Sequence, residues 1–348
     1  MNLLLLLAII FIIVFIYYWR KPYVMGKIEK FGTGTISVPL SDHQTSVQIQ
    51  DGTNGSTVLL LHNSPMDSGM WQPLYDTFAQ YASLGQKIPT LISYDLRGHG
   101  TAWMPVDPKF SDTNVKNTAW TIDQFVDDCK LVYDKAIGTG KVIVCGFGFG
   151  GIVGQKFALK YPQLIEELVL LQTTIRPSSH LASRINVLGA PNGWIAQNSG
   201  ITYLTNDDTF MQTTMCEWFY LPAEICGEQA SSLNGQTDLN SPYFRMAVAL
   251  LREGSATTML QIDKLLAGTD FTADWKTASS PPFTIHILAA SEDPISTPAE
   301  MTATYTDIYN TNRSMTVAMD IVTGKHGFTI MRPDYIAHIL CTNCKKSV

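Results

Sequence analysis

The run from Val142 to Gly151 constrains the fold of this chain more than any other stretch. Residues 142–145 are apolar, four glycines follow within the next six positions, and an apolar, helix-like stretch begins at Ile152. A short apolar run bounded by glycines predicts a buried strand, and the stretch after it predicts a helix. A turn this sharp needs a strained backbone, which glycine permits because it carries no Cβ. The sequence therefore predicts a strand, a tight turn at Gly148 and a helix.

Buried strands and amphipathic helices alternate along most of the chain. This alternation favours right-handed crossovers and a mostly parallel sheet that helices cover on both faces. The two alternating strands that come first predict an antiparallel edge. Strands are predicted at 34–40, 45–50, 58–61, 90–94, 142–145, 168–171, 283–289 and 315–322, and helices at 71–81, 122–137, 152–161, 297–309 and 334–340.

The stretch from Thr174 to Ser280 interrupts this alternation. It is rich in polar residues, glycines and aromatics, and only 244–251 and 258–266 have helical spacing. Because the sheet pattern resumes at Phe283, we predict an inserted cap rather than a separate domain. The predicted parts are a membrane anchor at 1–20, a juxtamembrane linker at 21–33, the first part of the core at 34–173, the cap at 174–280 and the second part of the core at 281–348.

The N-terminal segment predicts a transmembrane helix. Leu3 to Trp19 carries no charge, and about 17 helical residues span roughly 25 Å, which is short but sufficient for a bilayer. Tyr17, Tyr18 and Trp19 fit an aromatic belt at the membrane interface. A cleaved signal peptide needs a basic start and small residues at the cleavage site, and neither is present. Basic residues follow the segment and none precedes it, so the positive-inside rule predicts a single-pass anchor with the main domain on the cytoplasmic side.

Charge and cysteine content restrict the possible partners. The net charge of −6 and the absence of a basic stripe argue against a nucleic-acid partner. The C-x-x-C at Cys341 and Cys344 stands alone, which is too little for a zinc site, and no metal or cofactor is expected. Cys216 and Cys226 could pair if the domain were luminal, and Asn54 and Asn312 begin glycosylation sequons of a kind that occurs often by chance.

Three motifs together resemble the α/β-hydrolase superfamily. Leu59–His62, Tyr94–Gly100 and Gly146–Gly151 occur in the order and spacing of epoxide hydrolases, haloalkane dehalogenases and capped esterases, and the resemblance covers roughly residues 35–340. It implies an α/β-hydrolase fold with a cap. It also implies a catalytic acid at Asp293, just after a late strand, and a catalytic base at His326, after the last strand.

The resemblance further implies an oxyanion hole. Its donors would be the backbone N–H of Phe149 and an N–H from Asn63 or Ser64. His62 resembles the histidine of the family's oxyanion loop, which glycine normally follows. Asn63 takes that glycine's place, and we expect asparagine to be tolerated there because it visits the left-handed region.

The position of the nucleophile is degenerate. Gly148 stands where esterases have serine and epoxide hydrolases have aspartate. Glycine has no nucleophilic side chain, so the chain cannot form the covalent intermediate of these enzymes at this position. Cys145 lies on the strand before the turn and Ser64 on the oxyanion loop, and neither is favoured as a substitute. The tight turn at Gly148, which the family calls the nucleophile elbow, resembles that of the non-catalytic NDRG-type relatives. Those relatives lack an intact acid–histidine pair, whereas this chain keeps one.

Two classes of function follow. The favoured hypothesis is a membrane-anchored pseudoenzyme that acts as a binding, scaffold or structural subunit, with protein partners in a membrane assembly. The alternative is a hydrolase or lyase in which His326, oriented by Asp293, acts as general base without a covalent intermediate. A receptor that holds a small apolar ligand under the cap, or an engineered serine-to-glycine form, also fits the sequence.

Overall fold

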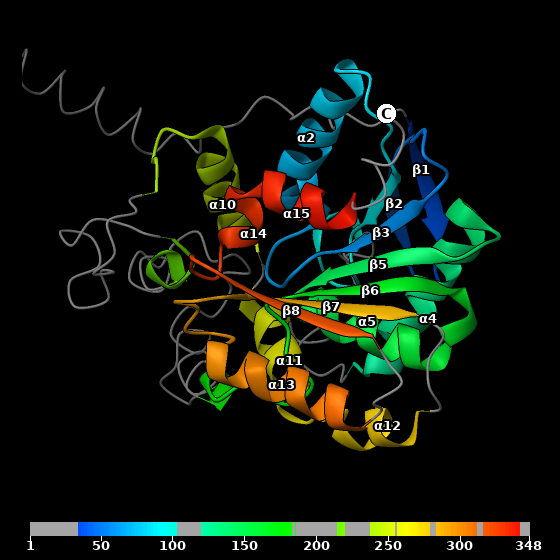
Figure 1. Ribbon diagram of the computed structural model, residues 1–348. Helices are drawn as coiled ribbons and strands as arrows, with labels where there is room; N and C mark the ends of the chain where they lie inside the picture. Colours follow the sequence, from blue (N-terminus) through cyan, green and yellow to red (C-terminus); the bar gives the residue numbers. More distant parts are fainter. Residues whose placement is uncertain are drawn as a thin grey trace, which may run out of the picture. The chain divides into compact units, whose positions relative to one another are not determined.

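A computed structural model of the chain describes residues 34–102, 120–182, 185, 214–219, 237–254, 256–278, 283–311 and 316–341. Its centre is an eight-stranded sheet in the order β1-β2-β4-β3-β5-β6-β7-β8 (Figure 1). β1 pairs antiparallel with β2, and β2 with β4, while all other neighbours are parallel. The mostly parallel sheet with an antiparallel edge is thereby confirmed. The strands are Gly34–Pro39, Gln44–Gln50, Thr57–Leu61, Thr90–Tyr94, Val142–Phe147, Ile165–Leu171, Thr284–Ala290 and Val317–Val322.

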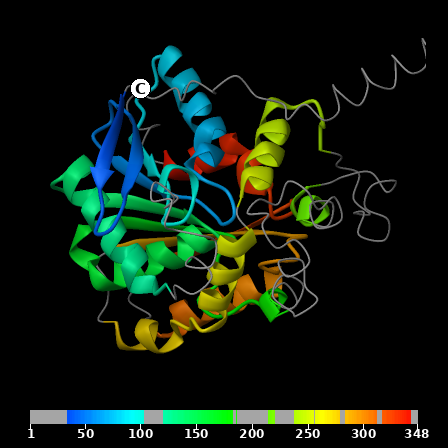
Figure 2. The same ribbon diagram turned by 180° about the vertical axis from the view of Figure 1, so that it is seen from behind.

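Helices cover both faces of the sheet (Figures 1 and 2). The pair α2 and α15 lies on one face, and α4, α5, α12 and α13 contribute side chains to the core on the other. Between β6 and β7 the described residues form helices and no strand. The helices are α2 (Gln72–Ser83), α4 (Ile122–Val132), α5 (Phe149–Lys160), α10 (Pro242–Glu253), α11 (Ala256–Ala267), α12 (Thr272–Thr277), α13 (Pro298–Thr311), α14 (Phe328–Met331) and α15 (Pro333–Leu340), with single turns at Ser68–Trp71, Gly100–Ala102 and Pro162–Leu164.

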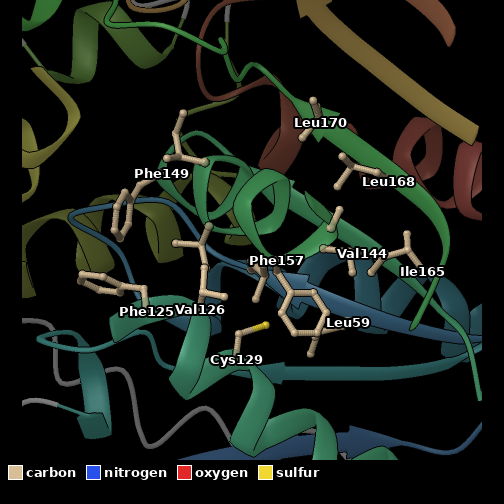
Figure 3. Close-up of a cluster of buried hydrophobic side chains, with 14 of the residues drawn as sticks. Leu59, Phe125, Val126, Cys129, Val144, Phe149, Phe157, Ile165, Leu168 and Leu170 are labelled. Carbon is tan, nitrogen blue, oxygen red and sulfur yellow. The ribbon is translucent and has the colours of Figure 1, made fainter. Parts of the chain in front are cut away.

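A hydrophobic core lies between the sheet and α4 and α5 (Figure 3). Leu168 and Leu170 of β6 both point into it, because alternate residues of a strand face the same side. Phe125 of α4 and Phe149 of α5 pack edge to face there, with ring centroids 4.9 Å apart. Burying each such side chain stabilises the fold by about 1.5–3 kcal/mol, so the first turn of α5 is held firmly against the sheet.

The structure departs from the predicted helices in two ways. The helix predicted at 122–137 ends as an α-helix at Val132 and continues as a π-helical turn, Tyr133–Ile137. Gly138 then ends it with a φ of 78°. In addition, α12 and α14 were not predicted, because helices of six and four residues are too short to show a 3.6-residue period.

The anchor at 1–20 and the linker at 21–33 lie outside the described residues, and so do Cys226, Cys344 and Asn312. None of the helices in the described part of the chain combines the length and hydropathy that a membrane span needs. Cys216 and Cys341 are disulfide-bonded, whereas Cys129 and Cys145 are free and buried.

Candidate active site

Four strands bring the predicted site residues to one edge of the sheet. Asn63 follows β3, Gly148 follows β5, Asp293 follows β7 and His326 follows β8. The carboxyl ends of parallel strands meet at the same edge, which is where α/β proteins place their sites. Residues far apart in the chain therefore face one another across a few ångströms.

The turn at Gly148 has the strained backbone that the glycines predict. Gly148 has φ 50° and ψ −113°, which L-residues rarely adopt, and it caps the N-terminus of α5. Its N–H donates to Leu171 O at 3.0 Å and ties the turn to β6. A Cβ on Gly146 would lie 2.6 Å from the backbone of Gly150 and Gly151. The glycines thus allow the end of β5 and the start of α5 to approach closely.

Asp293 and His326 form a buried hydrogen-bonded pair. His326 Nδ1 lies 2.8 Å from Asp293 Oδ2, and both side chains are at most 2% exposed. The other oxygen, Oδ1, accepts the backbone N–H groups of Ile295 at 2.8 Å and Ser296 at 3.0 Å. Gln172 Nε2 donates to Oδ2 at 2.8 Å. The carboxylate is therefore held by four donors and fixes the imidazole ring.

Aromatic rings enclose His326. Its ring centroid lies 4.9 Å from that of Phe147 and 4.6 Å from that of Trp218. Trp218 belongs to the described segment 214–219, whose carbonyl oxygens bind the histidine loop. Trp218 O accepts the Gly327 N–H at 2.8 Å, and Cys216 O accepts from Lys325 Nζ at 2.7 Å. Burial lowers the pKa of Lys325.

The side chain of Asn63 lies where a nucleophile would. A Cβ built on Gly148 would come within 3.0 Å of the Oδ1, Cγ and Nδ2 atoms of Asn63. Asn63 Oδ1 accepts the Phe149 N–H at 2.8 Å, and Nδ2 lies 3.0 Å from His326 Nε2. One carboxamide therefore contacts both the N–H expected in the oxyanion hole and the nitrogen expected to act as base.

These contacts assign the proton on His326. Because Oδ1 of Asn63 accepts from a backbone N–H, its Nδ2 is the atom that faces the imidazole. Nδ2 can only donate, so His326 Nε2 accepts and the ring proton sits on Nδ1, facing Asp293. This is the tautomer that a general base needs, but its lone pair is already used.

The loop after β3 differs from the expectation in its backbone. Gln172, with φ 50°, is the only non-glycine residue with positive φ in the described ranges, so Asn63 does not use the left-handed backbone that was the reason to expect asparagine to be tolerated there. The Asn63 N–H points at Met70 Sδ, 3.5 Å away, rather than toward Gly148. The Ser64 N–H is left as the second donor that the family pattern would supply.

The two histidines of this region have structural contacts. His62 Nε2 accepts the Leu96 N–H at 2.8 Å, which links the loops after β3 and β4. His99 Nε2 lies 3.1 Å from Ser64 Oγ. Burial, together with the neighbouring His62, lowers the pKa of His99 to about 3, so it is neutral. Ser64 thus contacts a histidine other than His326.

A cavity of about 50 Å³ adjoins the pair. Asn63, Gly148 and His326 are among the residues that line it. The lining residues that lie in the stretch predicted as a cap are Thr174, Arg176, Pro177, Ser178, Leu181, Leu266 and Thr269. About 10–15 Å³ holds one water molecule by this measure, so there is room for only a small group. Among the described residues, no group of three or more His, Cys, Asp or Glu side chains is placed to hold a metal ion.

Comparison with known proteins shows the family of the chain. Residues 58–337 match the family model described as alpha/beta hydrolase family. The chain belongs to the alpha/beta hydrolase family. The crystal structure of the enol-lactonase from Burkholderia xenovorans LB400 superimposes with a TM-score of 0.64 at 16% identity, over 88% of this chain and 98% of that one. At this identity the likeness shows the family's fold alone.

Curated members of the family are similar over a shorter stretch. The pimeloyl-[acyl-carrier protein] methyl ester esterase of Nitrosomonas europaea is 27% identical over 37% of this chain, and the proline iminopeptidase of Flavobacterium johnsoniae is 30% identical over 39%. The match covers 42% and 41% of those relatives' own lengths, so this chain spans about two fifths of each.

Two residues of the site were missed in the sequence. Gln172 directly follows β6, and polar residues at the carboxyl end of a buried strand were the signal that could have identified it. Trp218 gave no such signal, since a tryptophan in an aromatic-rich insertion reads as core. Cys145 is fully buried on β5, and burial raises the pKa of its thiol, so it has no role here.

Proposed function

We propose that this chain is a non-catalytic member of the alpha/beta hydrolase family, a pseudoenzyme that acts by binding, as a scaffold or structural subunit. The observation that carries the proposal is the Asn63 side chain. It fills the space of the missing nucleophile and hydrogen-bonds to Phe149 N–H and His326 Nε2. The family's reaction needs both of these groups free.

The alternative is a hydrolase or lyase in which His326 is the general base. The buried Asp293–His326 pair favours it. Before His326 could accept a proton, however, Asn63 would have to rotate away from its two buried partners. Each such hydrogen bond contributes about 1 kcal/mol, and an unpaired buried group costs about 1–3 kcal/mol more. The pseudoenzyme is therefore the better-supported reading.

Turnover by the purified full chain tests the proposal. The names of the relatives suggest the substrates: p-nitrophenyl and methyl esters, a proline p-nitroanilide and an enol-lactone. We expect no turnover above buffer with any of them, and no change on His326→Ala. Saturable turnover that His326→Ala abolishes would overturn the proposal in favour of the general-base enzyme.

We also propose that segment 1–20 anchors the chain and that the folded part faces an oxidising compartment. Disulfide-bonded Cys216 and Cys341 support this side, because disulfides persist outside the reducing cytosol. The charge bias favours the opposite side, but it rests on four basic residues alone. We give more weight to the disulfides, since cytosolic reductants would open them.

Alkylation in intact cells followed by mass spectrometry decides the side. With thiols trapped before lysis, we expect the peptides of Cys216 and Cys341 to stay unmodified until a reductant is added. Cys129 and Cys145 are the matched controls, since both are free and should be alkylated once the chain is denatured. Alkylation of Cys216 and Cys341 without reductant would restore the cytoplasmic orientation.

A further inference from the structure

We infer that the residues at positions 63 and 148 depend on each other, and that the Asn63 carboxamide blocks a serine-hydrolase site that lacks only its serine. We call this carboxamide the plug. This inference rests on the proposed function and deepens it. It attributes the proposed lack of catalytic activity to positions 63 and 148 together, rather than to the loss of the nucleophile alone.

The first step of the argument is steric. The three atoms nearest to a Cβ at position 148 are Oδ1, Cγ and Nδ2 of Asn63, all of them side-chain atoms. Any side chain at 148 therefore needs the carboxamide to leave, and the carboxamide at 63 needs a glycine at 148. Gly148 leaves the space that a nucleophile would occupy, and the Asn63 carboxamide fills that space.

The second step is polar. A serine at 148 would present its Oγ to His326 Nε2, and a bound acyl oxygen would accept from Phe149 N–H. Asn63 satisfies both groups instead, with Nδ2 at 3.0 Å and Oδ1 at 2.8 Å. The rest of the site is in place: Asp293 orients His326, and Gln172 and two backbone N–H groups orient Asp293.

The third step concerns the substitution that removes the plug. Asn63 does not have positive φ, so alanine fits its backbone and glycine is not needed. In Asn63→Ala/Gly148→Ser the serine Oγ would attack the ester carbonyl carbon while its proton moves to His326 Nε2. The proton then passes to the departing alcohol as the ester C–O bond breaks, and water hydrolyses the acyl-serine by the same route.

The experiment compares variants of the full chain on p-nitrophenyl acetate. Only Asn63→Ala/Gly148→Ser should hydrolyse it, at a rate at least about 100-fold above the buffer background, since loss of a catalytic serine costs far more than this in well-formed sites. Gly148→Ser alone should stay inert. Asn63→Ala/Gly148→Ala is the matched control: it has the same packing without the hydroxyl, and it should be inert. Adding His326→Ala to the active variant should abolish its rate.

A stability cycle keeps the inference testable if the active variant folds poorly. Gly148→Ala should lower Tm more when residue 63 is asparagine than when it is alanine. The strain of a side chain at φ 50° is common to both backgrounds and cancels. Equal losses of Tm in the asparagine and alanine backgrounds would overturn the inference. So would a Gly148→Ser variant as active as Asn63→Ala/Gly148→Ser. A folded but inert double variant would overturn it too, yet would leave the pseudoenzyme proposal standing, which only wild-type turnover defeats.

Discussion

Asp128→Ala is expected to lower the free energy of unfolding by about 3 kcal/mol. Asp128 on α4 binds the Arg97 guanidinium through both oxygens, at 3.0 and 3.1 Å, and the two side chains are 2% and 1% exposed. Removing the carboxylate leaves a buried cation whose remaining charged partner is Asp42, at the surface. The free energy of unfolding from urea denaturation of the purified chain measures this loss.

Asp134→Ala is the matched control. It removes an aspartate from the same helical run, but its pair with Lys130 is exposed at 45% and 29%. Exposed pairs at this spacing contribute about 0.3–0.5 kcal/mol. Both variants gain similar helix propensity from alanine, so the difference reports burial. If the two variants lose equal stability, the Arg97–Asp128 pair does not have the role assigned here.

Gly150→Ala is expected to destabilise the fold by about 3 kcal/mol or more. Gly150 lies in the first turn of α5, and a Cβ there would come within 3.0 Å of the backbone of Leu61 and His62. Those atoms belong to the end of β3 and the loop after it, so they cannot move aside as a side-chain tip can. Urea denaturation again provides the measurement, with soluble yield as a second readout.

Gly154→Ala tests whether the close approach of Gly150 to the β3 backbone, rather than the loss of a glycine from α5, causes the expected destabilisation. Gly154 lies one turn further along α5, and its Cβ would meet only side-chain atoms, the nearest being Val144 Cγ1 at 3.1 Å. Alanine also improves helix propensity by about 1 kcal/mol. We expect stability within about 1 kcal/mol of wild type. A Gly150→Ala variant as stable as Gly154→Ala would contradict the close approach of α5 to β3.

The positions of the strands along the chain could be predicted because their signals are local, and the alternation of strands and helices predicted a mostly parallel sheet. Apolar runs of four to seven residues bounded by glycine or polar residues predicted the buried strands, and the four glycines at 146–151 predicted the sharp turn. Asp293 and His326 were assigned through the resemblance to the α/β-hydrolase superfamily, and each lies in the loop after a strand whose carboxyl end reaches the same edge of the sheet.

The contacts that decide the chemistry could not be predicted in this way. Asn63 was interpreted through its backbone, whereas its effect comes from its side chain and a partner 86 residues away. Gln172 acts on Asp293 across 121 residues. No period or spacing within a short window carries such information, because packing of the whole sheet brings these residues together.

The four donors around Asp293 have a consequence for how acid–histidine pairs are interpreted. Replacing this aspartate would remove the acceptor of the imidazole and of two backbone N–H groups, and would leave Gln172 Nε2 with Lys325 O as its remaining acceptor. The pair therefore belongs to the framework that joins the loops after β6, β7 and β8, whether or not a reaction takes place beside it. In this chain the intact Asp293–His326 pair is therefore accounted for by its structural contacts, and the lone pair of His326 Nε2, which faces Asn63, is the feature on which activity depends.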